Sequence, residues 1–221
     1  MGTDPSLAYQ GHVARQTTDA RAVFGQTMGL VAFTVGFFAL GAWIGRDIEG
    51  VAGIFILLGA FIPLLGLNVA VRRGSQQLAI GLLFTFGLMF GLALGPVLSE
   101  YASANPAALW QAGGATALFI AGFGAYGYAT SRDLSSWSRF LFFGLLGLIA
   151  VGIVFIFVSI PGENIIWAVL GLGLFALLTI FDFNRLRRAG MEVAPLIAAS
   201  IFLDVVNVFL FFLQLFGGGR D

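Results

Sequence analysis

The strongest constraint on this chain is an apolar run from Ala194 to Phe216, which holds 23 residues and a single charged side chain, Asp204. About 20 apolar residues in an α-helix, at ~1.5 Å each, cross the ~30 Å hydrocarbon core of a bilayer. The run therefore predicts a transmembrane helix. A charge near the centre of such a helix costs at least roughly 2.5 kcal/mol, so Asp204 is expected to face the protein interior or a watery path and to have a partner.

Six further apolar runs precede this one, separated by short segments that contain charges, proline or small polar residues. The seven predicted spans are Met28–Gly45, Gly50–Val71, Gln77–Leu98, Ala107–Ala129, Phe140–Ile160, Asn164–Phe183 and Ala194–Phe216. Because every connection is short, we predict an all-α polytopic membrane protein that forms one seven-helix bundle. A cytoplasmic tail (residues 1–27), a transmembrane domain (28–216) and a short external tail (217–221) complete the predicted organisation.

The composition excludes several classes of protein and site. The chain is 59% hydrophobic and 10% charged, whereas soluble domains are usually about 25% charged. Its net charge is zero, so it lacks the basic field that nucleic-acid binding needs, and no nucleic-acid partner is expected. With no cysteine and one histidine, His12, a zinc or iron site is not expected either. No cofactor is predicted.

The arginines predict the orientation, because all 11 basic residues are arginine. Nine of them fall on one side of the seven predicted spans, and only Arg46 and Arg220 fall on the other. The nine are Arg15, Arg21, Arg72, Arg73, Arg132, Arg139, Arg185, Arg187 and Arg188. The positive-inside rule then predicts a cytoplasmic N-terminus and an external C-terminus.

The last span carries a polar stripe. Ser200, Asp204, Asn207 and Gln214 are separated by four, three and seven residues, which places them along one face of a helix. A helix with one polar face among mostly apolar helices is expected at the centre of the bundle. Ordinary hydrogen bonds between helices can explain Ser200, Asn207 and Gln214, but they explain an ionisable side chain poorly.

Asp182, near the end of the sixth span, is the expected partner of Asp204. The short turn around residues 188–193 makes the sixth and seventh spans antiparallel neighbours. Two carboxylates brought together in low dielectric cannot both ionise cheaply, so they are expected to share a proton and titrate as a unit. The pair is then a candidate proton sensor or cation ligand, with Arg73 as a counter-charge. The alternatives are an interfacial Asp182 paired with Arg185, and a merely solvated Arg73.

Several segments are similar to one known family. They are Phe181–Asn184, Ser200–Phe209, Leu213–Gly217, the loop Tyr128–Ser135, and Gly95-Pro96 followed by Tyr101. Together they resemble the Bax inhibitor-1, or transmembrane Bax inhibitor motif, family in its prokaryotic form. The resemblance covers nearly the whole chain, and the motif in the last helix is its most specific part.

The resemblance implies a fold, a location and a function. It implies a seven-helix bundle around a central last helix, in a bacterial inner membrane. It further implies that Asp182 and Asp204 form the di-aspartyl pair of a pH-sensitive calcium leak, as the ligands of the transported ion, and that Arg73 latches the pair. The chain departs from the family pattern at Phe181 and Phe202, which are often tyrosine in the family, and at Gln214, where many members carry arginine.

Three functions compete at this point. A cation leak needs a carboxylate-lined path and a closure with two states, both of which the pair can supply. A non-catalytic regulator of a membrane protease, or of a stress or cell-death pathway, would need the carboxylates only to hold the bundle together. An intramembrane aspartyl protease also uses two aspartates. Such proteases carry Gly-x-Gly-Asp, whereas Ile201, Phe202 and Leu203 precede Asp204, so we expect no enzymatic activity.

Overall fold

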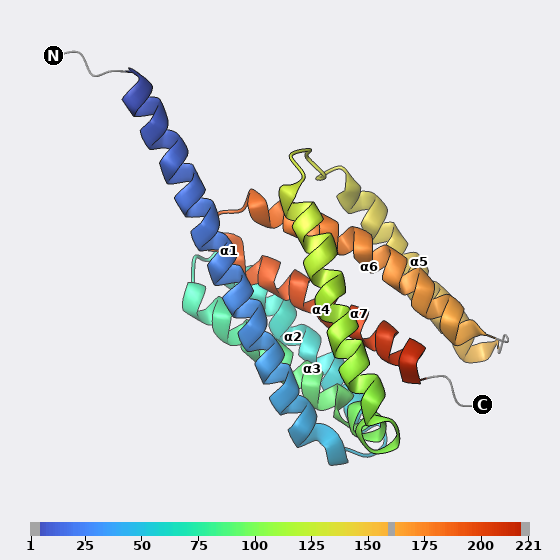
Figure 1. The fold of residues 1–221 in the computed structure, drawn as a ribbon. Coiled ribbons are helices and arrows are strands. Elements are labelled where there is room, and N and C mark those ends of the chain that lie inside the picture. Colours follow the sequence, from blue (N-terminus) through green and yellow to red (C-terminus); the bar gives the residue numbers. More distant parts are fainter. Residues whose placement is uncertain (1–4, 159–161, 218–221) are drawn as a thin grey trace.

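The computed structural model describes the backbone of residues 5–158 and 162–217, and the side chains of residues 20–155, 157–158 and 162–217. In these residues every regular element is helical (Figure 1). The long helices are α1 (Pro5–Ile44), α2 (Ala52–Arg72), α3 (Gln76–Ala104), α4 (Pro106–Ala129), α5 (Trp137–Phe157), α6 (Glu163–Arg187) and α7 (Ala194–Gly217). Short 3₁₀ turns, η1 (Gly45–Asp47) and η2 (Met191–Val193), follow α1 and precede α7. Seven helices in the described residues are long and apolar enough to cross a membrane, which confirms the predicted fold class.

The observed bounds differ from the expected spans mainly at the start of the chain. Helix α1 already begins at Pro5, and its candidate membrane span begins at Ala20 rather than Met28. Part of the segment expected as a tail is therefore helical, and the N-terminal turns of α1 extend beyond the other helices (Figure 1). The expected boundary at Ile160, and residues 1–4 and 218–221 of the two expected tails, lie outside the described residues.

Local sequence signals explain how one connection is made. Between α3 and α4, the Asn105 side chain accepts a hydrogen bond from the Ala108 amide, and Pro106 occupies the first position of α4. An asparagine cap followed by proline is a strong start signal for a helix. Helix α4 therefore begins immediately after α3 ends, and the two helices run in opposite directions.

Helix α7 lies at the centre of the bundle. It contacts α1, α2 and α3 on one side and α4 and α6 on the other, so it joins these two groups of helices. Figure 1 shows α7 passing behind α1 and α4. About 56% of the span in α7 is buried, against 11% of the span in α5, which packs mainly on α6. The predicted central position of the last helix is confirmed.

The tightest helix contact joins α1 to α3, and glycine makes it possible. A Cβ atom added at Gly91 would lie 2.0 Å from the carbonyl oxygen of Phe38, and one at Gly41 would lie 2.1 Å from that of Leu88. Gly87 and Gly95 on α3 also leave too little room for a Cβ atom, which would lie 2.7 and 2.6 Å from its nearest neighbour. Small residues of this kind let two membrane helices approach closely. The pairing of α1 with α3 therefore fixes the wall against which α7 packs.

Candidate functional site

The two predicted carboxylates lie in the interior of the bundle. Asp182 on α6 and Asp204 on α7 are each 3% exposed. Helices α6 and α7 pack against each other after the short connection through η2, and the two carboxylates are close enough to act on each other electrostatically. We call Asp182 and Asp204 the aspartate pair.

Two hydroxyl groups accompany the aspartate pair. Ser200, one turn before Asp204 on α7, donates a hydrogen bond to Oδ2 of Asp182. Thr179, three residues before Asp182 on α6, is fully buried and lies beside Asp204. Its hydroxyl does not reach hydrogen-bonding geometry, because Thr179 Oγ1 and Asp204 Oδ2 are both buried without a partner among the described atoms. The site therefore holds a carboxylate oxygen whose hydrogen-bonding capacity is unused.

Apolar side chains enclose this polar cluster. Ile201 and Phe202, which precede Asp204 on α7, are completely buried. The Phe202 ring makes edge contacts with Phe38 of α1 and with Phe86 of α3, at centroid distances of 6.0 and 5.6 Å. These aromatic rings fill the space on the α1–α3 side of the pair. The two carboxylates are thus almost completely shielded from solvent in this conformation.

The remaining members of the polar stripe do not converge on the pair. The Asn207 side chain donates to the Leu203 carbonyl of its own helix at 2.8 Å. Gln214 donates to Oδ1 of Asn164 at 3.1 Å, which joins the far ends of α7 and α6. Of the stripe, the structure brings only Ser200 into contact with the aspartate pair.

Arg73 stands apart from the pair in this conformation. It caps the C-terminal end of α2 and its side chain is exposed. Ion pairs among the described side chains include Arg46–Asp47 at 3.2 Å and Arg188–Asp133 at 2.6 Å, and neither involves the aspartate pair. The cation whose charge acts on Asp182 is the exposed Arg185 of α6, which lies beyond ion-pair distance.

Beyond the pair, the end of α6 holds the loop between α4 and α5. The buried Asn184 side chain donates to the carbonyl oxygens of Gly127, Thr130 and Arg132 at 3.0–3.3 Å and accepts from the Leu134 amide. Arg187 donates to the Ala129 and Thr130 carbonyls, and Arg188 to those of Ser131 and Arg132. We did not predict this loop anchor. The sequence did contain a signal for this anchor. Asn184 follows Asp182 by two positions, so its polar side chain falls on a different face of α6 and cannot belong to the aspartate pair.

The loop also carries an ionised carboxylate outside the membrane spans. Hydrogen bonds from the hydroxyl and the amide of Ser135 lower the pKa of Asp133 below its usual range, and the Arg188 guanidinium lowers it further. Asp133 is exposed to solvent and forms an ion pair with Arg188. The loop is therefore tied to α6 by charge as well as by backbone contacts.

The described residues hold no group of three or more histidine, cysteine, aspartate or glutamate side chains placed to bind a metal. Calcium usually takes six to eight oxygen ligands. The aspartate pair, with Ser200 and Thr179 beside it, offers only part of such a set.

Comparison with known proteins assigns the chain to a family. Residues 20–221 match the family described as "Inhibitor of apoptosis-promoting Bax1" (Bax1-I). The chain belongs to the Bax1-I family. This match confirms the resemblance seen in the sequence, and it includes the aspartate pair and the loop anchor.

Bacterial relatives extend this assignment. The Bax1-I chain is 32% identical to an uncharacterised protein of Caulobacter vibrioides, over 80% of this chain and 74% of the relative. It is 27% identical to the inner membrane protein YbhL of Escherichia coli, over 96% and 95% of the two chains. An uncharacterised protein of Pseudomonas aeruginosa is 28% identical over 92% and 93%.

Proposed function

We propose that this Bax1-I protein is a pH-sensitive cation leak, with calcium as the permeant ion, gated by the aspartate pair. One observation carries the proposal. Two carboxylates from antiparallel neighbouring helices lie at 3% exposure in the interior of a membrane bundle, and one of their oxygens, Oδ2 of Asp204, has no hydrogen-bond partner among the described residues. Ionisable groups so placed in a membrane protein are expensive and typically mark an ion or proton path.

The chemistry of the pair supports control by pH. Two neighbouring carboxylates in low dielectric are expected to share a proton, and losing that proton leaves an anionic site that attracts a cation. Protonation therefore changes both the charge of the site and its value as a ligand. The enclosed position behind Ile201 and Phe202 corresponds to a closed path, so conduction would need α6 and α7 to move apart.

Arg73 is proposed as the latch. Near neutral pH an ionised pair would attract the guanidinium and hold the arginine-rich end of the bundle shut, whereas protonation would release it. Because Arg73 is exposed at the end of α2, this role requires its side chain to swing toward α6. Arg185 already acts on Asp182 and is the natural competitor for the role.

The location and the orientation are part of the proposal. YbhL is named an inner membrane protein, which supports a bacterial inner membrane for this chain as well. The arginine distribution supports a cytoplasmic N-terminus and an external C-terminus. We propose the lipid bilayer and calcium as partners, with no cofactor and no nucleic acid.

We propose no catalytic activity. A protease would need room for a substrate backbone beside Asp204, but Ile201 and Phe202 are completely buried there.

A second candidate, a regulator of a membrane protease or of a stress or cell-death pathway, is favoured by the Ser200–Asp182 hydrogen bond. That contact lets the carboxylates serve simply to hold α6 and α7 together.

Calcium flux in proteoliposomes at an acidic and at a neutral pH tests the proposal. Asp182→Asn and Asp204→Asn should each weaken the pH dependence, and Arg73→Ala should raise the leak at neutral pH. Arg72→Ala, which removes the adjacent exposed charge, is the control and should leave the flux unchanged. If the parent protein passes no calcium at any pH, or none of the three substitutions changes the flux, the regulator is the better description.

A further inference from the structure

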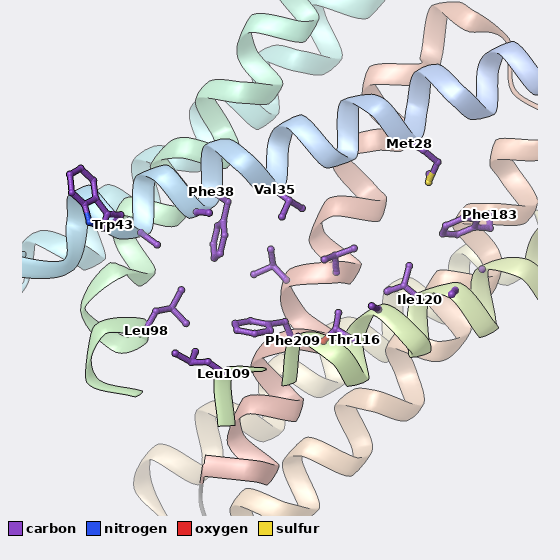
Figure 2. A pocket seen from close by; sticks show the side chains of 18 of the residues that line it. Met28, Val35, Phe38, Trp43, Leu98, Leu109, Thr116, Ile120, Phe183 and Phe209 are labelled. Carbon is purple, nitrogen blue, oxygen red and sulfur yellow. The ribbon is translucent and has the colours of Figure 1, made fainter. Parts of the chain in front are cut away.

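A long apolar groove lies between α1 and α4, with α7 as its floor. Its volume is about 1420 Å³. Figure 2 shows Met28, Val35 and Phe38 of α1 on one side, and Thr116 and Ile120 of α4 on the other, with Phe209 of α7 next to Thr116. The aspartate pair does not line this space. We call it the α1–α4 groove.

The groove exists because α4 presents small side chains where no helix covers them. Gly113, Ala117, Ala121 and Ala125 recur at four-residue spacing along the wall. Within the described residues α1 and α4 form no extensive contact, whereas α1 and α3 pack closely through their glycines. A Cβ atom added at Gly113 would have no neighbour within 4 Å. A face of this kind usually packs against another helix, but here α1 does not cover it.

The surroundings identify the occupant as a lipid chain. The walls are almost entirely apolar, and apolar cavities stay dry and take up apolar ligands. Along α1 the groove extends from Arg21 to Arg46, a distance of about 37 Å at ~1.5 Å per residue. That length exceeds the ~30 Å hydrocarbon core, so each arginine lies near the headgroup level of one leaflet.

The two arginines differ in their freedom to bind a headgroup. Arg46 pairs with Asp47 at 3.2 Å and lies over the Trp43 ring at 5.2 Å. Arg21 is exposed and makes no hydrogen bond or ion pair with any described side chain. Tyr128 lies at the same end, in edge contact with Phe24, and both line the groove. A guanidinium without a partner among the described side chains, at the same end of the groove as a tyrosine, favours an anionic headgroup.

We propose that the α1–α4 groove is a binding site for an anionic phospholipid of the leaflet next to Arg21. The phosphate lies at Arg21, and an acyl chain lies along the small residues of α4 against Phe183, Val205 and Val206. The site is separate from the aspartate pair and does not depend on the proposed cation leak. It makes one phospholipid an integral part of the packing between α1 and α4.

Native mass spectrometry of the full-length, delipidated protein tests the site. The protein is titrated in detergent with phosphatidylglycerol or with phosphatidylcholine of identical acyl chains, and the Kd of the first bound lipid is measured. Phosphatidylglycerol should bind more tightly. Arg21→Gln should weaken phosphatidylglycerol binding about fivefold, as expected for one arginine at the membrane surface, and weaken phosphatidylcholine binding less, because the choline cation offsets the charge of its phosphate. Arg72→Gln, which removes an exposed arginine outside the groove, should change neither.

Variants that fill the groove with a larger side chain provide a second test of the lipid site. Ala121→Phe places a ring where the chain would lie and should weaken both lipids. Ala107→Phe, exposed on α4 outside the groove, should weaken neither. If Ala121→Phe proves unstable, Ala117→Leu takes its place. Equal binding of the two lipids by the parent protein, or filling variants that bind as the parent does, would overturn the proposal and leave only non-specific boundary lipid.

Discussion

Replacing Gly91 with alanine should separate α1 from α3. The added Cβ atom would lie 2.0 Å from the carbonyl oxygen of Phe38, 2.8 Å from its carbonyl carbon and 2.9 Å from the Ala42 nitrogen. All three are backbone atoms of α1, so no side-chain rotation can relieve the contact. Ordinary van der Waals contact starts at 3.4 Å, and restoring it from 2.0 Å requires α1 to withdraw by 1.4 Å.

The cost can be isolated by comparison with Gly81 on the same helix. A Cβ atom at Gly81 would have no neighbour within 4 Å, so Gly81→Ala reports only the better helix propensity of alanine, up to about 1 kcal/mol. Gly91→Ala shares that gain and adds the overpacking cost, typically about 1–3 kcal/mol. Relative to Gly81→Ala, we therefore expect Gly91→Ala to unfold about 2–12 °C lower, at 2–4 °C per kcal/mol for a chain of this size.

Thermal unfolding in detergent, followed by circular dichroism, measures this difference. Unfolding of membrane proteins is commonly irreversible, so all variants are compared at one scan rate and one detergent concentration. Equal midpoints for Gly91→Ala and Gly81→Ala would refute the close contact between α1 and α3.

Three further predictions follow from the aspartate pair and the loop anchor. Asp182→Asn and Asp204→Asn should be non-additive in thermal stability, because each removes the same coupling, and strictly additive effects would reject a shared proton. Asn184→Ala should free the loop at residues 129–135 at a cost of about 1–3 kcal/mol, seen as faster amide hydrogen exchange there with α7 unchanged. The folded-state pKa of Asp133 is lowered. Its ionised carboxylate therefore stabilises the folded loop at pH values above the unfolded-state pKa, and this stabilisation disappears as the pH falls through the folded-state pKa. Protection of the Ser135 amide should therefore persist at neutral pH, disappear only in acid, and be absent at every pH in Asp133→Ala, which removes the accepting oxygen.

The sequence allowed the number of helices and the central position of α7 to be predicted, since both follow from strong periodic signals. Apolar runs of about 20 residues have few alternatives to a membrane helix. The polar stripe on α7 pointed to Asp204 and Ser200 as interior residues, and the structure places both against α6. Asp182 was found because a short turn forces α6 and α7 to be neighbours.

Other features depend on how helices are placed against one another, which the residue pattern does not specify. Thr179 shares a face of α6 with Asp182, but its position beside Asp204 depends on the register between α6 and α7. The α1–α4 groove depends on two helices failing to meet, and no local signal distinguishes that from close packing. The part of α1 before Met28 lacks an apolar run, so its helical conformation was not expected.

The loop anchor at Asn184 has a mechanical consequence. Asn184 follows Asp182 by two residues on one rigid helix, so the two side chains cannot change position independently. A rotation of α6 that moved Asp182 relative to α7 would pull Asn184 away from the carbonyls that it holds in the loop at residues 129–135. The loop would then report, at the surface, a change made in the interior. Because the chain has no cysteine, a thiol introduced at Ser131 would be unique, and a fluorophore attached there would follow that change directly.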